Sequence, residues 1–267
     1  MNRNPTAYLD QTRPRILAHR GLSTAAPENT LLAFGQALAN GATHLETDVH
    51  ASSDGVAVIS HDATLSEHGP ALNQLTMAEL GRIDLGQGQF YCSLAEVLAA
   101  FPQARFNIDL KSADAVLPAA HAINAAAAGD RVLLTSFSER RRRRVLRLVP
   151  GASTSASATG VTLMVIAVAL RQHWALPRIL RGVGAIQVPE HAGRVRIVTP
   201  RVIDQMHAIG VEVHVWTVND PDRMRRLLSL GVDGLVTDRC DLAAEVAEGQ
   251  TVGGADTVSE KSPPERP

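Results

Sequence analysis

Short apolar runs alternate with helical patterns along most of the chain, and this alternation constrains the fold more than any other feature. The runs that fit strands cover residues 15–20, 43–49, 105–111, 131–136, 152–157, 184–189, 211–218 and 233–238. Amphipathic segments lie between them; one has Leu31, Phe34 and Leu38 at helical spacing after the helix-start signal Asn29-Thr30. Such alternation is typical of βαβ units with a parallel sheet. It predicts an α/β fold, a single (β/α)8 TIM barrel.

One further run, residues 56–60, interrupts the alternation. It follows the second predicted strand after a turn centred on Asp54-Gly55. A parallel crossover needs about a dozen residues, so this run is expected to return antiparallel as a hairpin. The hairpin would bring His61 near Glu46 and Asp48. Residues 62–92 would then form the long loop after strand 2, which contains a short insertion.

The ends of the chain differ in composition from the rest. Residues 1–13 are polar, and residues 249–267 are rich in Gly, Pro and charged residues without apolar periodicity. We therefore predict a poorly ordered N-terminal segment at 1–13, one catalytic barrel at 14–248 and a disordered tail at 249–267.

Charge and hydropathy limit the partners. The formal net charge of −1 gives no reason to expect nucleic acid. Val161–Leu170, the longest apolar stretch, is too short to span a membrane and is expected to be a buried barrel helix. The first residues do not resemble a secretory signal, and the two cysteines have no metal or redox spacing, so a cytoplasmic location is expected. The oligomeric state is not determined by the sequence.

Polar residues stand where the predicted strands end, and in such barrels the active site is built at those ends. His19 and Arg20 end the first strand, Glu46 and Asp48 the second, and Asp109 and Lys111 the third. Buried carboxylates repel one another unless a cation or proton intervenes. Three of them predict a hard divalent ion such as Mg²⁺ or Ca²⁺, and Arg20 and Lys111 suit a phosphate.

Six segments of the chain together resemble the signature of a known family. The segments 18–34 (AHRGLSTAAPENTLLAF) and 41–65 (GATHLETDVHASSDGVAVISHDATL) resemble the glycerophosphodiester phosphodiesterase signature. Residues 107–111 (NIDLK), 134–137 (LTSF), 215–220 (VWTVND) and 231–238 (GVDGLVTD) match it in the same order. The resemblance covers about residues 15–245, and the ordered set is far more specific than any single motif.

The resemblance implies a role for each matched residue. Glu46 and Asp48, with Asp109 third, would hold one divalent metal ion, Mg²⁺ or Ca²⁺. His19 and His61 would be the general acid and base, and Arg20 and Lys111 would contact the phosphoryl oxygens. The implied reaction passes through a cyclic phosphate and releases sn-glycerol 3-phosphate and an alcohol. Asp109 stands where the family usually has Glu, which puts its direct ligation in question.

Several alternatives stay open. The substrate could be a water-soluble glycerophosphodiester, or a lysophospholipid or sphingolipid diester cleaved as by a phospholipase D; the lack of an evident membrane-binding patch favours the first. The barrel could instead bind a phosphorylated ligand without turnover. Trp216 could contact substrate or only fill the barrel. Glu28 and Asn29 are expected to cap the first helix, with an orienting role for Arg20 as the alternative. The arginines at 140–144 are expected to form a solvated helix face.

Overall fold

The computed structural model describes residues 7–10, 13–24 and 26–253. Eight strands run parallel: β1 (Arg15–His19), β2 (His44–Ala51), β6 (Arg105–Leu110), β7 (Val132–Thr135), β8 (Ser153–Thr154), β9 (Ala185–Val188), β12 (Glu212–Val215) and β13 (Gly234–Thr237). They pair in the order β8-β7-β6-β2-β1-β13-β12-β9. A parallel bridge between Ser155 and Ala185 connects the two outer strands, so the ring nearly closes. The predicted α/β barrel is confirmed.

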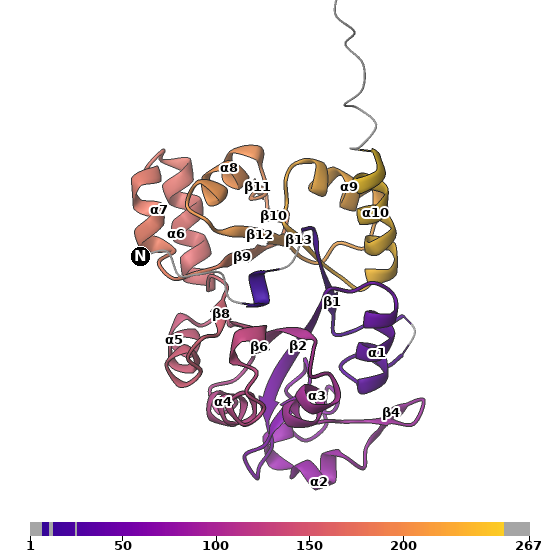
Figure 1. Ribbon diagram of the computed structural model, residues 1–267. Coiled ribbons are helices and arrows are strands. Elements are labelled where there is room, and N and C mark those ends of the chain that lie inside the picture. Colours follow the sequence, from indigo (N-terminus) through magenta and orange to yellow (C-terminus); the bar gives the residue numbers. More distant parts are fainter. Residues whose placement is uncertain (1–6, 11–12, 25, 254–267) are drawn as a thin grey trace, which may run out of the picture.

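Helices surround the barrel (Figure 1). They are α1 (Leu31–Ala39), α3 (Leu94–Ala100), α4 (Val116–Ala125), α5 (Glu139–Leu148), α6 (Ala158–Ala169), α7 (Leu176–Ile179), α8 (Pro200–Ala208), α9 (Pro221–Ser229) and α10 (Cys240–Gly253). Most begin where a short polar side chain accepts a hydrogen bond from the first turn, which satisfies an amide that has no partner within the helix. These caps are Thr30, Ser93, Ser138, Ser157, Thr199 and Asp220.

The run at 56–60 forms β3 (Ala57–Ile59), which pairs antiparallel with β2 as expected. The segment after it has more structure than a loop: η2 (Leu72–Gln74), α2 (Met77–Leu80) and the hairpin of β4 (Asp84–Gly86) and β5 (Gln89–Phe90). Val58, Leu72 and Leu80 form a small apolar cluster beneath it. This cluster explains why a segment without strong periodicity is ordered, since it has its own buried contacts.

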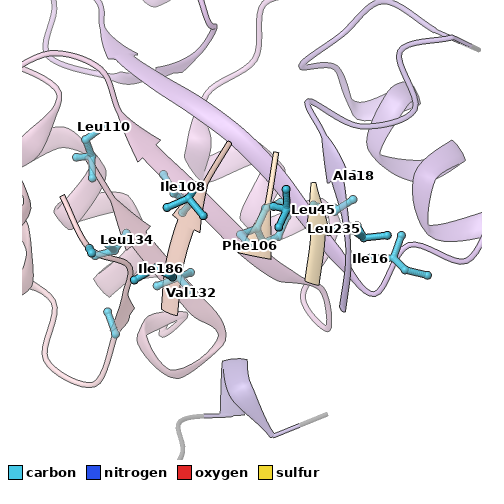
Figure 2. Packing of buried hydrophobic residues seen from close by; sticks show 14 of the residues in the cluster. Ile16, Ala18, Leu45, Phe106, Ile108, Leu110, Val132, Leu134, Ile186 and Leu235 are labelled. Atoms are coloured by element: carbon cyan, nitrogen blue, oxygen red, sulfur yellow. The ribbon is translucent and has the colours of Figure 1, made fainter. Parts of the chain in front are cut away.

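The main hydrophobic core lies between the barrel and its helices. Alternate residues of each strand point outward, and Figure 2 shows several of them, among them Ile16, Leu45, Phe106 and Ile108. Phe34 of α1 meets Phe106 edge to face with ring centroids 6.3 Å apart. Because strand side chains alternate, the residues between these apolar ones point into the barrel. The interior is therefore free to carry polar groups.

At the amino end of the strands the interior holds a buried ionic cluster. Arg15, almost fully buried, donates from Nε and Nη2 to Glu212 at 2.6 and 2.7 Å. His214 contacts the same carboxylate at 3.0 Å. Residues Ala7–Leu9 form a 3-10 helix (η1) below the cluster, with Tyr8 fully buried against His44. Residues 7–10 are therefore ordered within a segment, 1–13, that was expected to be poorly ordered, while residues 1–6 and 11–12 lie outside the described part.

At the other terminus, α10 continues to Gly253, past the start of the predicted tail, and residues 254–267 lie outside the described part.

Helix α6 was expected to be buried, but one of its faces is exposed. Met164, Ala167 and Val168 face the core, but Leu163, Ile166 and Leu170 are 46%, 48% and 62% exposed. The apolar stretch is therefore buried on one face only. Across residues 7–253, apart from the gaps given above, no helix has the length and apolar character needed to cross a bilayer.

Candidate active site

Strand register gathers the polar side chains at the carboxyl end of the barrel. His19 is in register with Glu46, and Glu46 with Asn107. One level further along, Asp48 is in register with Asp109. Residues in register on parallel strands point to the same side, so both levels face the interior. The predicted carboxylates therefore come from two neighbouring strands and lie side by side.

A cavity of about 570 Å³ opens at this end of the barrel, and all eight residues singled out from the sequence line it. They are His19, Arg20, Glu46, Asp48, His61, Asp109, Lys111 and Trp216. His61 arrives from the end of the β2–β3 hairpin. The two histidines thus share one cavity although they belong to separate segments. Their chemical roles stay predictions at this point.

Lys111 lies at the centre of the carboxylates. Its Nζ atom is 2.8 Å from Asp48 Oδ1 and 3.0 Å from Asp109 Oδ2. Burial works against the ammonium ion, but the two carboxylates outweigh it and raise the pKa of Lys111. Lys111 is therefore a cation of the cavity lining that two carboxylates hold in place.

Glu46 and Asp109 carry more negative charge than this cation balances. Burial, and then the nearby Asp48, raise the pKa of Glu46 well above its ordinary value. Burial also raises the pKa of Asp109, and Lys111 opposes the shift only in part. Carboxylates in this condition are stabilised by a further cation or by a proton.

Arg20 is held in a constrained backbone. Its φ is 57° and that of Gly21 is 85°, both in the left-handed region. A Cβ atom on Gly21 would lie 2.7 Å from the carbonyl carbon of Ala33, so only glycine fits beside α1. The turn directs the Arg20 amide to Glu46 Oε2 at 3.0 Å. The guanidinium Nε lies 3.3 Å from Asp48 Oδ2 without forming a hydrogen bond, while Nη1 donates to both carboxylate oxygens of Glu28 at 3.1 Å.

The expected capping role of Glu28 and Asn29 is not what the structure shows. The N-cap of α1 is Thr30, whose hydroxyl accepts from the Ala33 amide. Glu28 pairs with Arg20, and Asn29 Oδ1 accepts from the Thr47 hydroxyl at 2.8 Å. Glu28 therefore positions Arg20, which was the alternative expectation. Asn29 connects the segment to β2 through Thr47.

Each histidine of the cavity is paired with a carboxylate through Nδ1. His19 Nδ1 lies 2.6 Å from Asp238 Oδ1, and His61 Nδ1 lies 2.8 Å from Asp62 Oδ1. Asp238 is itself fixed by Asn219, which donates to its other oxygen at 2.7 Å. A carboxylate at Nδ1 favours the tautomer that carries its hydrogen on this atom. Nε2 of each ring then stays available for proton transfer.

The fit to a divalent metal ion can be tested on the same atoms. Asp48 Oδ2, Asp109 Oδ1 and Asn107 Oδ1 are buried acceptors without a hydrogen-bond partner. Such oxygens are the ligands that Mg²⁺ and Ca²⁺ prefer. No group of three or more His, Cys, Asp or Glu side chains within the described residues is already arranged around a metal position. The donor set thus fits a hard divalent ion held by carboxylate oxygens, with water and substrate oxygens completing the shell.

The opposite wall of the cavity is apolar. Trp216 and Phe137 meet edge to face at 6.4 Å, and they are 36% and 64% exposed. Val161 of α6 and Ile197 line the same wall. The cavity therefore has a charged side formed by β1, β2 and β6 and an apolar side formed by the later strands.

Two site residues were not identified from the sequence. Asn107 shares a strand face with Asp109 and Lys111, and this two-residue spacing was a signal for it. Asp238 follows β13, so its place at a strand end was also a signal. His44 and His214, in contrast, are fully buried near the ionic cluster at the other end of the barrel.

The comparisons with known proteins agree with this site. The model of the "Glycerophosphoryl diester phosphodiesterase family" matches residues 19–242. A Mycobacterium tuberculosis protein named "Probable glycerophosphodiester phosphodiesterase 2" is 40% identical over 235 residues, which cover 86% of this chain and 89% of that protein.

Solved structures show the same fold. A glycerophosphodiester phosphodiesterase from Agrobacterium tumefaciens superposes with a TM-score of 0.72 at 26% identity, over 89% of this chain and 100% of that one. An Oleispira antarctica phosphodiesterase, solved with the product sn-glycerol-3-phosphate, superposes with a TM-score of 0.73 at 22% identity, over 88% and 97%. The chain belongs to the glycerophosphoryl diester phosphodiesterase family and is a phosphoric diester hydrolase.

Proposed function

We propose that this protein hydrolyses glycerophosphodiesters to sn-glycerol 3-phosphate and an alcohol with the help of one divalent metal ion. The observation that carries the proposal is the single cavity lined by two histidines, three carboxylates and two cations. The product bound to the Oleispira antarctica relative supports the same substrate class. A phosphodiester is an anion, and Arg20 and Lys111 supply the positive charge that binds it.

The proton transfers are assigned to His19 and His61. One imidazole accepts the proton of a glycerol hydroxyl as its oxygen forms a bond to phosphorus. The other donates a proton to the alcohol oxygen as the second phosphorus–oxygen bond breaks, which leaves a cyclic phosphate that water opens. Imidazole titrates near neutrality, so it serves in both directions. Asp238 and Asp62 contact the two rings at Nδ1 and leave Nε2 for these proton transfers.

Glu46, Asp48 and Asp109 are proposed to hold the metal ion. When bound, such an ion neutralises charge on the phosphoryl oxygens and lowers the pKa of a coordinated hydroxyl. Lys111 fixes the orientation of Asp48 and Asp109, and the Arg20 amide fixes that of Glu46. Adding Mg²⁺ or Ca²⁺ back to the metal-stripped protein distinguishes the two ions.

The test is the release of glycerol 3-phosphate from glycerophosphocholine and glycerophosphoethanolamine. His19→Ala and His61→Ala are each expected to lower kcat by about 100-fold or more while the circular dichroism spectrum is unchanged. His68→Ala, at an exposed histidine outside the cavity, is the matched control and should retain full turnover. Normal turnover in either cavity variant would refute the acid–base assignment. Binding of substrate without any turnover in the unmodified protein would support the non-catalytic alternative.

A second substrate class is favoured by the apolar wall. Phe137, Trp216 and Val161 offer an apolar surface that suits an acyl chain, as in a lysophospholipid. Assays of glycerophosphocholine and lysophosphatidylcholine side by side separate the two classes. A higher kcat/KM for the lysolipid, lost in Phe137→Ala, would make the lipid diester the preferred substrate.

A further inference from the structure

The α6 surface, defined as Leu163, Ile166 and Leu170 of α6 with Trp174 of η4 (His173–Ala175), is the most exposed apolar group outside the cavity. Trp174 is 79% exposed, and the three aliphatic side chains recur at helical spacing on the outer face of α6. The opposite face of α6 packs on the barrel core. A helix with one apolar face already buried has no need of a second one for folding. An exposed apolar face of this kind marks a surface for binding.

The stretch of sequence that contains this surface carries charge of one sign. Residues 140–189 contain nine arginines and no Asp, Glu or Lys. Since the whole chain has a formal net charge of −1, the remaining residues carry −1 − 9 = −10. Arg142 and Arg143 pair with Glu139, but the described part of the chain gives Arg171, Arg178 and Arg181 no acidic partner. All three of these arginines are exposed. The stretch of sequence that contains the α6 surface is thus positively charged in a chain that is otherwise acidic.

The helix that carries this surface also reaches the mouth of the cavity. α6 begins there, and Ala158, Val161 and Thr162 of its first turns line the cavity. Figure 1 shows α5, α6 and α7 on one side of the barrel. A body that contacts the outer face of α6 would therefore contact the same helix that lines the entrance to the active site.

We propose that the α6 surface and its surrounding arginines dock on a lipid surface that carries anionic head groups. Aliphatic side chains and a tryptophan beside arginines are the composition of helices that lie in a membrane interface. The arginines would attract the anionic head groups, and the apolar side chains would enter the boundary with the acyl chains. A second copy of the chain is a poorer occupant, because a twofold contact would bring the two arginine-rich faces together.

The experiment is co-sedimentation of the full chain with vesicles. Phosphatidylcholine vesicles and phosphatidylcholine–phosphatidylglycerol vesicles are compared at low and high salt. We expect binding to the anionic vesicles, weakened by salt because the arginine contribution is screened. Absence of binding to the anionic vesicles at low salt would overturn the proposal.

Two sets of variants locate the binding surface. The triple substitution Leu163→Gln, Ile166→Gln and Leu170→Gln is expected to weaken binding by at least about tenfold. The triple substitution Arg171→Gln, Arg178→Gln and Arg181→Gln should also weaken it, by about fivefold for each arginine that contacts the surface. Phe90→Gln and Arg82→Gln are the matched controls, at exposed positions in the segment after β3. Binding that is unchanged in both triple variants would refute this surface as the site.

A spectroscopic measurement places Trp174 at the interface. The chain has only two tryptophans, Trp174 and Trp216. In the Trp216→Phe variant the emission reports Trp174 alone, and it should shift to shorter wavelength when anionic vesicles are added. An unchanged emission maximum in a sample that sediments with the vesicles would contradict docking by this surface. Sedimentation equilibrium completes the set, because self-association that the Leu163/Ile166/Leu170 variant abolishes would assign the surface to a second copy instead.

Discussion

The imidazole Nδ1 of His19 lies 2.6 Å from Asp238 Oδ1, and this contact joins the end of the first barrel strand to the end of the last. The hydrogen bond from His19 lowers the pKa of Asp238, so the carboxylate is ionised at neutral pH. It fixes both the tautomer and the direction of the ring. Asp238 is thus a positioning residue for His19 rather than a group that touches substrate.

Asp238→Asn should therefore lower kcat with little change in KM. The amide can keep the shape of the contact but loses the charge that stabilises an imidazolium, and we expect a fall of about 10- to 100-fold. The pH profile of kcat should also shift, which a purely structural role would not produce. Asp222→Asn, at an exposed aspartate of α9, is the control. An unchanged pH profile in Asp238→Asn would refute the positioning role.

Glu28 is expected to act on substrate binding through Arg20. Its carboxylate receives two hydrogen bonds from Arg20 Nη1, and it is about half exposed. Because an exposed ion pair contributes at most about 1 kcal/mol, Glu28→Gln should raise KM by up to about fivefold and leave kcat nearly unchanged. Steady-state kinetics on glycerophosphocholine measure both constants, with the exposed Glu67→Gln as control. A loss confined to kcat would show that Arg20 is not held for substrate binding by Glu28.

A metal ion should stabilise the protein through Glu46. Burial and the nearby Asp48 raise the pKa of Glu46, so an ionised Glu46 is unfavourable without a further cation. Glu46→Gln should accordingly raise the Tm of the metal-free protein, with each kcal/mol worth about 2–4 °C. Mg²⁺ or Ca²⁺ at 100 times its Kd should stabilise the unmodified protein by about 2.7 kcal/mol and the variant much less. Equal metal-induced shifts of Tm in both proteins would remove Glu46 from the metal site.

The buried cluster below the barrel predicts how acid affects stability. Burial alone would raise the pKa of Glu212, but its hydrogen bonds to Arg15 and His214 outweigh burial and lower it. A carboxyl whose pKa is lowered by folding contributes stability above its unfolded value, and this contribution is lost as pH falls toward its folded value. Burial also lowers the pKa of His44 to about 3, so between pH 6.5 and 3 the unfolded chain binds a proton that the folded chain does not, and this favours unfolding. Both groups destabilise the fold in acid.

Glu212→Gln tests this cluster. The variant leaves the almost fully buried Arg15 without its carboxylate partner, and we expect a loss of about 3–5 kcal/mol at pH 7. The loss should shrink as pH is lowered below 4.5, because the unmodified protein loses the same interaction there. Urea unfolding at several pH values measures both effects. A difference in unfolding free energy that does not change with pH would contradict the ionic account.

Much of the fold was predictable because each strand run carries its own pattern. Along β6, apolar Phe106, Ile108 and Leu110 alternate with polar Asn107 and Asp109. This alternation indicates a strand and also which of its faces meets the helices. The return of β3 followed from Asp54-Gly55. The burial of Tyr8 was not predictable, since one aromatic residue in a polar segment gives no periodicity and its contacts come from His44, far along the chain.

The site was predictable to the extent that its residues lie on strands. Glu46, Asp48, Asp109 and Lys111 follow the two-residue spacing of their strands, so their convergence could be inferred. The pairing of Glu28 with Arg20 and of Asp238 with His19 depends on the turns after β1 and β13, where no such spacing applies. The exposure of one face of α6 depends on the position of the helix in the ring. A helix whose residues are nearly all apolar has no pattern that indicates which of its faces is buried.

The central claim is that a divalent ion and the charged side of the cavity act together on a glycerophosphodiester. The most direct measurement is the rate of glycerol 3-phosphate release from glycerophosphocholine by the metal-stripped protein, before and after Mg²⁺ or Ca²⁺ is added back. We predict no detectable product after chelation and full recovery with one of the two ions, but no recovery in Asp48→Asn. A rate that is the same in the stripped and the reloaded protein would contradict the account.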